Sequence, residues 1–302
     1  MDVFAATRLA IGTGCLLVAA ASDLRTRRVR DPLWIGLGTI GLVLLAVELI
    51  LRQAPWPLWS IAGSGALLFY GIFFGNPLFD EDRFHARPAR IAVFLAATVL
   101  FLSPLVYEPN APGLAELASM PVMIAVYQVF YRLRVLHGGA DAKALIALSL
   151  LVPTYPDALP FPLFAVSPIV QPTLRVLFPF SLVVWVDAAV VSLAVPIALL
   201  IYNAVRGDFA LPQALLGYRA PLDPLPKRVW LMERITEHGE HVLILFPKRG
   251  TDTSADVARL RSAGIERAWV QPQTPFMVPL LLGFLLAFVA GNLLVAILGI
   301  GR

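Results

Sequence analysis

Long apolar runs recur along the whole chain and leave few folds open to it. An α-helix needs roughly 20 residues to cross the hydrocarbon core of a membrane. Hydrophobic residues make up 58% of the 302 residues and charged residues only 15%, whereas about a quarter of a soluble domain is charged. The sequence therefore predicts an α-helical polytopic membrane protein with about eight transmembrane segments, at 3–22, 33–51, 57–75, 90–107, 114–133, 142–160, 180–204 and 275–299. The segment 142–160 is the weakest, because three prolines interrupt it.

The basic residues predict the orientation of these segments. No basic stretch precedes the first run, so we expect a retained helix and not a cleaved signal peptide. With the N-terminus outside, most Lys and Arg residues fall in inner loops, as the positive-inside rule requires. The outer side then holds only Arg8, Arg52, Arg175 and Arg302. The net charge of +4 fits loops that face anionic lipid, and no aromatic-studded basic patch indicates nucleic acid.

Residues 205–273 break the apolar pattern and predict a small cytoplasmic α/β module. Short apolar strings typical of strands occupy 229–232, 241–246 and 267–270. Between the last two, Ser254 and Gly264 are the expected N-cap and stop of a helix. The proline-rich segment 221–226 is expected to link the module to the membrane part. The expected domains are a membrane-embedded part over 1–204, the module over 205–273 and a C-terminal transmembrane helix over 274–302.

Two aspartates occupy corresponding positions at the inner ends of predicted segments. Asp23 follows the first segment, and Asp141 begins the sixth. Burying an acid at a membrane span is costly, so such a residue indicates function by default. Two carboxylates that meet there can share one proton, and then one serves as general base to a water and the other as general acid. The structural alternative is that Asp23 pairs with nearby arginines and Asp141 caps its helix.

The residues around both aspartates resemble the prepilin peptidase family. The segment Ser22-Asp23-Leu24-Arg25, followed by further basic residues, is similar to the first catalytic segment of that family. The segment Gly138-Gly139-Ala140-Asp141-Ala142-Lys143 resembles the archaeal form of its Gly-x-Gly-Asp motif. Residues 268–279 resemble the end of the extra C-terminal region found in some archaeal preflagellin (prepilin) peptidases.

This resemblance implies an intramembrane aspartyl endopeptidase that removes short basic leaders from archaellin and type IV pilin-like precursors. Asp23 and Asp141 would be its catalytic residues, supported by Gly138, Gly139, Ala140 and Lys143. It implies a multi-pass protein of the cell membrane with its active site at the cytoplasmic face, whose partners are these precursors and membrane lipid. No cofactor or metal is expected. Bacterial members also N-methylate their product and carry paired Cys-x-x-Cys motifs; the single Cys15 cannot supply those, so methyltransferase activity is not expected.

Other acids support alternative interpretations. Asp80, Glu81 and Asp82 would lie in an inner loop and could attract a basic leader, or form a solvated turn balanced by nearby arginines. Asp187, inside an apolar segment, suggests a second class of function, a secondary transporter or channel in which Asp23, Asp141 and Asp187 relay ions. A hydrogen bond from Asp187 to a neighbouring helix, or a contact with Arg175, is the structural alternative.

Glu48 and Glu116 are expected to be solvated, and Lys143 is expected to point away from Asp141 toward lipid headgroups. A third possible function is a catalytically inactive scaffold that holds partners through the module over 205–273.

Overall fold

The computed structural model describes residues 2–74, 79–80, 83–84, 87–136, 138–158, 160–164, 166–236, 238–247 and 253–299. They form two compact units. The helical unit comprises Met1–Val191 and Phe276–Arg302, and the sheet unit comprises Ser192–Pro275. The expected fold class, a helical polytopic protein with a small sheet-containing module, is confirmed.

The helical unit consists of packed apolar helices. Its elements are α1 Val3–Thr26, α2 Asp31–Leu51, α3 Trp56–Phe73, β1 Phe79–Asp80, β2 Arg83–Phe84, α4 Pro88–Tyr107, α5 Leu114–Arg132, α6 Gly139–Leu151, α7 Gln171–Leu177, α8 Phe180–Ser192, α12 Met277–Val289 and α13 Leu293–Leu298. Proline near the start of α2, α3 and α4 favours these helix beginnings, since the missing N–H has no partner there in any case.

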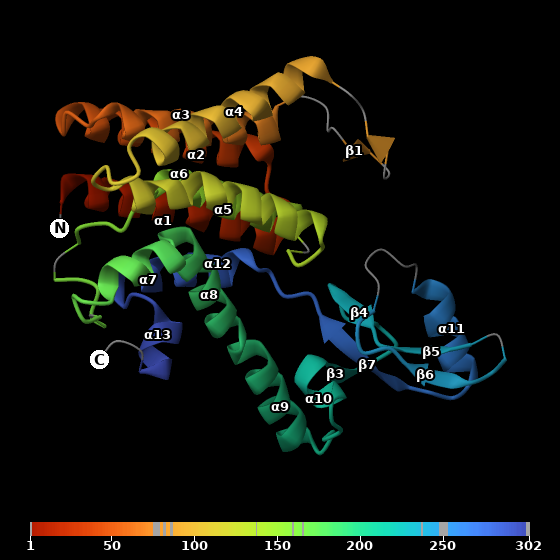
Figure 1. The fold of residues 1–302 in the computed structure, drawn as a ribbon. Coiled ribbons are helices and arrows are strands. Elements are labelled where there is room, and N and C mark those ends of the chain that lie inside the picture. Colours follow the sequence, from red (N-terminus) through yellow and green to blue (C-terminus); the bar gives the residue numbers. More distant parts are fainter. Residues whose placement is uncertain are drawn as a thin grey trace. The chain divides into compact units, whose positions relative to one another are not determined.

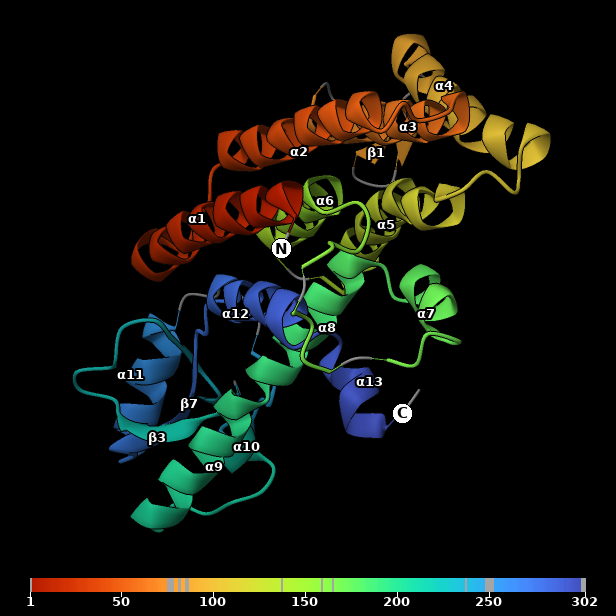
Figure 2. The ribbon, with the colours of Figure 1, turned by 90° about the vertical axis from the view of Figure 1, so that its left-hand side faces the viewer.

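Helix α6 lies at the centre of this unit. It packs against α1, α2, α3 and α5 (Figures 1 and 2). Nine of its thirteen residues are buried, and they join a core whose largest side chains include Trp34, Phe69, Tyr127 and Phe284. The helix that begins with the Asp141 motif is therefore held by neighbours on several sides.

Six helices in the described part of the chain are long and apolar enough to cross a membrane, fewer than the eight segments expected. These are α1 to α5 and the continuous stretch Phe180–Arg206. The expected segment 142–160 contains only α6, which ends at Leu151 before the prolines. At 1.5 Å per residue α6 is about 20 Å long, short of a hydrocarbon core of about 30 Å. The expected last segment, 275–299, is divided into α12 and α13 around Gly291, whose φ is 89°.

The sheet unit is built around antiparallel strands. Its elements are α9 Ala194–Arg206, α10 Gln213–Leu216, β3 Tyr218–Pro221, β4 Val229–Leu231, β5 Glu233–Ile235, β6 His241–Leu243, α11 Ser254–Ser262 and β7 Arg267–Pro272. β7 is the central strand of a three-stranded sheet in the order β3-β7-β4, and β5 pairs with β6. A small core of Ala220, Leu231, Leu260 and Val270 joins this sheet to α11.

The strands and helix expected in this region are present, with three differences. The proline-rich segment 221–226 connects β3 to β4 inside the unit, so it is not the link to the membrane part that the sequence suggested. Strands β3 and β5 and the short helix α10 were not expected. The N-cap of α11 is Thr253, and Ser254 is the first helical residue. Gly264, at φ 77°, follows the helix as expected. The expected domain limits stay predictions beside the unit limits given above.

Candidate functional site

The first motif, Ser22-Asp23-Leu24-Arg25, lies in the last turns of α1, and side-chain hydrogen bonds hold the turn that follows it. Asp23 is half-buried in the last turn of α1. The Ser22 Oγ donates to the carbonyl of Arg28 at 2.7 Å, and the Thr26 Oγ1 is 3.1 Å from the same oxygen. Arg27 adopts a left-handed conformation, with φ 57°. These contacts fold the chain back so that α2 begins at Asp31, eight residues after Asp23.

The second motif forms the beginning of α6. Gly138 is the N-cap, and its carbonyl accepts from the Asp141 backbone N–H at 3.1 Å. Asp141 is half-buried in the first turn. Its carboxylate lies so close to Gly138 that a β-carbon there would overlap it. A β-carbon on Gly139 would meet only the Tyr131 hydroxyl, at 3.4 Å.

An ion pair places the two motif-bearing segments at the same end of the helical unit. The Lys143 Nζ lies 2.6 Å and 2.7 Å from the two carboxylate oxygens of Asp31. Lys143 is two residues past Asp141, and Asp31 begins the helix that follows Asp23. Lys143 therefore has a protein partner, and its expected contact with lipid headgroups stays a prediction. Since only four residues separate α1 from α2, the end of α1 and the start of α6 lie at the same end of the packed helices.

The other predicted acids are Asp80, Glu81, Asp82 and Asp187. The backbone of Asp80 lies in β1, opposite Arg83 in β2, while Glu81 and Asp82 lie outside the described residues. Asp187 is fully buried in α8, and its Oδ1 accepts from the Leu293 N–H at 3.0 Å, at the start of α13. The structural interpretation of Asp187, a hydrogen bond to a neighbouring helix, is thereby observed.

A cavity of about 390 Å³ opens at the other end of the helical unit. Arg8 and Glu48 line it, 2% and 7% exposed, and form an ion pair of 2.7 Å that Arg52 extends. Glu48 is therefore buried, contrary to the expectation that it is solvated; Arg8, forty residues earlier, provides its counter-charge. Along α1, Arg8 and Asp23 are about 22 Å apart at 1.5 Å per residue.

Glu116, also expected to be solvated, is half-buried at this cavity, with 24% of its side chain exposed. It accepts from the Tyr155 backbone N–H at 2.7 Å and lies 3.9 Å from Arg175. Burial raises the pKa of the Tyr155 hydroxyl above its ordinary value. Arg175 therefore meets Glu116 and not Asp187. Glu48 pairs with Arg8 and Arg52, and Glu116 lies beside Arg175. The cavity is therefore lined by a network of ion pairs that joins helices.

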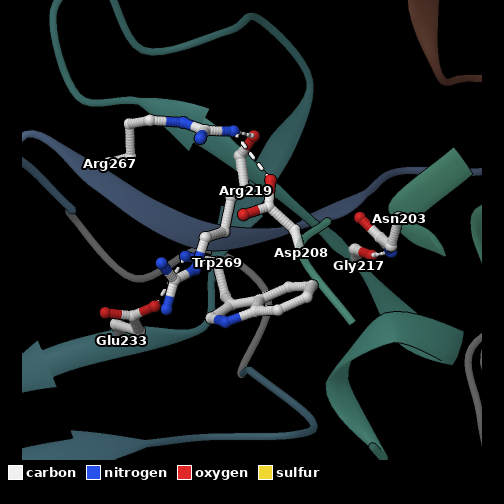
Figure 3. Close-up of polar contacts among 7 residues, drawn as sticks. All are labelled: Asn203, Asp208, Gly217, Arg219, Glu233, Arg267 and Trp269. Carbon is white, nitrogen blue, oxygen red and sulfur yellow. Dashed lines mark hydrogen bonds and ion pairs between the residues drawn. The ribbon is translucent and has the colours of Figure 1, made fainter. Parts of the chain in front are cut away.

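The sheet unit holds a second polar cluster that the sequence did not reveal (Figure 3). Glu233, 6% exposed, accepts from the Trp269 backbone N–H at 2.7 Å and lies 2.8 Å from the His241 Nε2. The Arg219 guanidinium lies over the Trp269 ring at 5.7 Å. These contacts join β3, β5, β6 and β7. Among the described residues, no group of three or more His, Cys, Asp or Glu side chains is arranged to hold a metal.

Both parts of the chain match known protein families. Residues 10–171 match the type IV leader peptidase family, and residues 210–293 match the archaeal peptidase A24 C-terminus, type II. A protein named preflagellin peptidase from Methanocaldococcus jannaschii is 22% identical over 95% of both chains. Another of that name from Methanococcus voltae is 21% identical over 96% of this chain and 97% of its own. The first match spans both aspartates and more than half of the sequence, and the chain belongs to the type IV leader peptidase family.

Proposed function

We propose that this protein is a membrane aspartyl endopeptidase that removes the leader peptide from archaellin and type IV pilin-like precursors. Membership of the leader peptidase family supports a protease of precursor leaders, and the name preflagellin peptidase, shared by two relatives, supports preflagellin as the substrate class. The observation that carries the proposal for this chain is the Lys143–Asp31 contact. It joins the start of the Asp141 helix to the helix that follows Asp23.

In the proposed mechanism, Asp23 and Asp141 share one proton. The ionised carboxylate takes a proton from a water molecule, whose oxygen attacks the scissile carbonyl carbon. The protonated carboxyl donates its proton to the carbonyl oxygen as the tetrahedral intermediate forms. When the C–N bond breaks, the carboxyl that took a proton from water passes it to the leaving amine, and the other carboxylate takes the proton of a hydroxyl on the intermediate, so the carboxyl pair regains its starting state. Two carboxylates a few ångströms apart favour such a shared proton, since both cannot ionise readily.

The proposed active site faces the cytoplasm. The loop between α1 and α2 carries Arg25, Arg27, Arg28 and Arg30, and the positive-inside rule assigns so basic a short loop to the inner side. The leader of a precursor would lie on the cytoplasmic side, where it can reach Asp23 and Asp141. The cut would then fall between the leader and the hydrophobic helix of the precursor. The chain has one cysteine, so we do not propose the methyl transfer that bacterial members perform.

The direct test is to incubate the purified protein with an archaellin precursor in detergent or liposomes. We expect a shortened product whose new N-terminus follows the basic leader, as read by mass spectrometry. Asp141→Asn, prepared in the same way, should yield no product. Wild-type protein that leaves every archaellin and pilin precursor intact would refute the proposed substrate class.

A further inference from the structure

One ammonium group joins three helices beside the proposed active site. The Lys143 Nζ, on α6, contacts both oxygens of Asp31 on α2 at 2.6 and 2.7 Å. The same nitrogen lies 5.9 Å from the centroid of the Phe73 ring, at the end of α3. The side chains of Lys143 and Asp31 are 35% and 52% exposed. An ion pair so exposed contributes little to stability, so its geometry is the more informative feature.

The pair lies on the face that α6 turns toward α2. Successive residues of an α-helix are about 100° apart, so Lys143 and Asp141 project about 200° apart around the axis. Holding Lys143 against α2 therefore turns Asp141 away from α2. Near the far end of α6, a β-carbon on Gly41 would lie 2.6 Å from the backbone of Leu150. That contact of two backbones limits the distance between the helices near one end of α6, and the ion pair adds a contact at the end that begins with the Asp141 motif.

Asp31 is also tied closely to the first motif. Only residues 27–30 separate α1 from α2, and the Ser22 hydroxyl secures that turn through the Arg28 carbonyl. Because this turn is short and hydrogen-bonded, a shift of Asp31 is expected to shift the end of α1 as well. We propose that Lys143 and Asp31 are positioning residues, whose ion pair sets the orientation of Asp141 relative to Asp23. This inference rests on the proposed function, in which those two aspartates act together.

Kinetics of charge-removing variants test the proposal. Lys143→Met and Asp31→Asn should each lower kcat about tenfold or more with little change in KM, because misplacing one catalytic group by about 1 Å can cost up to 100-fold. The double variant should be no worse than either single variant, since both remove one interaction. Lys143→Arg should restore most of the rate, because a guanidinium also binds a carboxylate through two hydrogen bonds.

Arg52→Gln is the matched control. Arg52 follows the opposite end of α2 and also forms an ion pair, with Glu48, yet its side chain is 61% exposed and far from Asp23. Its loss should leave kcat unchanged. A normal rate in Lys143→Met with a low rate in Asp31→Asn would mean that Asp31 serves only the start of α2. Either that result or strictly additive losses in the double variant would overturn the proposal.

A geometric measurement separates this inference from the proposed function. Asp23→Cys and Asp141→Cys, combined with Cys15→Ala, provide two thiols for a short bifunctional maleimide. Adding Lys143→Met should slow the cross-linking several-fold, whereas adding Arg52→Gln should not. This measurement needs no catalysis, so it stands even if the wild-type protein cleaves no precursor. If the wild type cleaves the precursor and the double-cysteine protein cross-links at the same rate with and without Lys143→Met, the positioning role alone is refuted.

Discussion

The carboxylate of Asp141 lies directly against the α-carbon of Gly138, three residues earlier in the chain. Gly138 has φ −97° and ψ 120°, a conformation open to any residue. Glycine is therefore needed at position 138 because a β-carbon would overlap the Asp141 carboxylate, and not because the backbone is strained. The N-cap carbonyl of Gly138 also accepts from the Asp141 N–H. The glycine and the aspartate thus form one local unit, in which the side chain of one fills the space that the other leaves.

Gly138→Ala should displace the Asp141 carboxylate and lower the cleavage rate about 100-fold, in line with the cost of misplacing a catalytic group by about 1 Å. Gly139→Ala is the matched control. Its β-carbon has room, and alanine stabilises a helix relative to glycine by about 1 kcal/mol. Steady-state kinetics on both variants provide the comparison. Equal rates for the two would show that the Asp141 carboxylate moves freely or takes no part.

Removing the proton-exchanging group at either aspartate should abolish cleavage. Asp23→Asn and Asp141→Asn keep the side-chain shape, so both variants should elute and melt like the wild type. Asp157→Asn, an exposed acid at the other end of the helical unit, should cleave normally. Product formation is followed on gels with a purified precursor. Near wild-type cleavage by Asp141→Asn would mean that Asp141 is only an acid in the first turn of α6, whose N-cap is Gly138.

The local features of the site follow from sequence, and the long-range ones do not. Helix periodicity alone predicted that Lys143 points away from Asp141. Its partner Asp31, 112 residues earlier, could not be found without the packing of α2 against α6. The same holds for Arg8 and Glu48, which read as separate charges near helix ends until the structure joins them. An ion pair between two helices depends on which of their faces pack together. The residue patterns of a single sequence do not show which faces these are.

Two of the expected segments contain shorter helices in the structure, for a related reason. The runs 142–160 and 275–299 are apolar enough, but in the first α6 stops before Pro153. In the second, the Asn292 side chain accepts from the Val295 N–H and begins a new helix. The buried Asp187 accepts from the next residue of that break, Leu293. Composition registers how apolar a segment is, whereas a helix break depends on one or two hydrogen bonds.

Activity should survive chelation. The proposed mechanism uses only the carboxyl pair and a water molecule, so EDTA should leave the initial rate unchanged. The measurement is cleavage by protein dialysed against EDTA, with and without added zinc or magnesium. A rate that disappears on dialysis and returns with zinc would contradict the shared-proton mechanism.

The buried ion pair at the other end should be needed for stability. Arg8→Met leaves the carboxylate of Glu48 without its buried partner, and breaking a buried pair in this way costs about 3–5 kcal/mol of unfolding free energy. Arg52→Gln, at the exposed side of the same carboxylate, should cost less than about 1 kcal/mol. Denaturant unfolding in detergent micelles measures both. The double variant Arg8→Met/Glu48→Leu should recover stability relative to Arg8→Met, and a further loss would contradict the account.

The acidic run Asp80, Glu81 and Asp82 is proposed to attract the basic leader of the precursor. At a separation near 4 Å, two exposed unit charges attract by about 1 kcal/mol in water and severalfold more at a protein surface. Replacing the three acids by Asn, Gln and Asn should therefore raise KM about tenfold while kcat changes little, because capture and not chemistry is affected.

Salt provides the second measurement on this acidic run. Exposed charges are screened over about 10 Å at 0.1 M ionic strength and over about 3 Å at 1 M, so the KM values of wild type and triple variant should converge as salt is raised. Asp223→Asn removes an acid that is 81% exposed in the sheet unit, and it should match the wild type at every salt concentration. If the triple variant has a normal KM at low salt, the run is a solvated turn and the leader is recognised elsewhere.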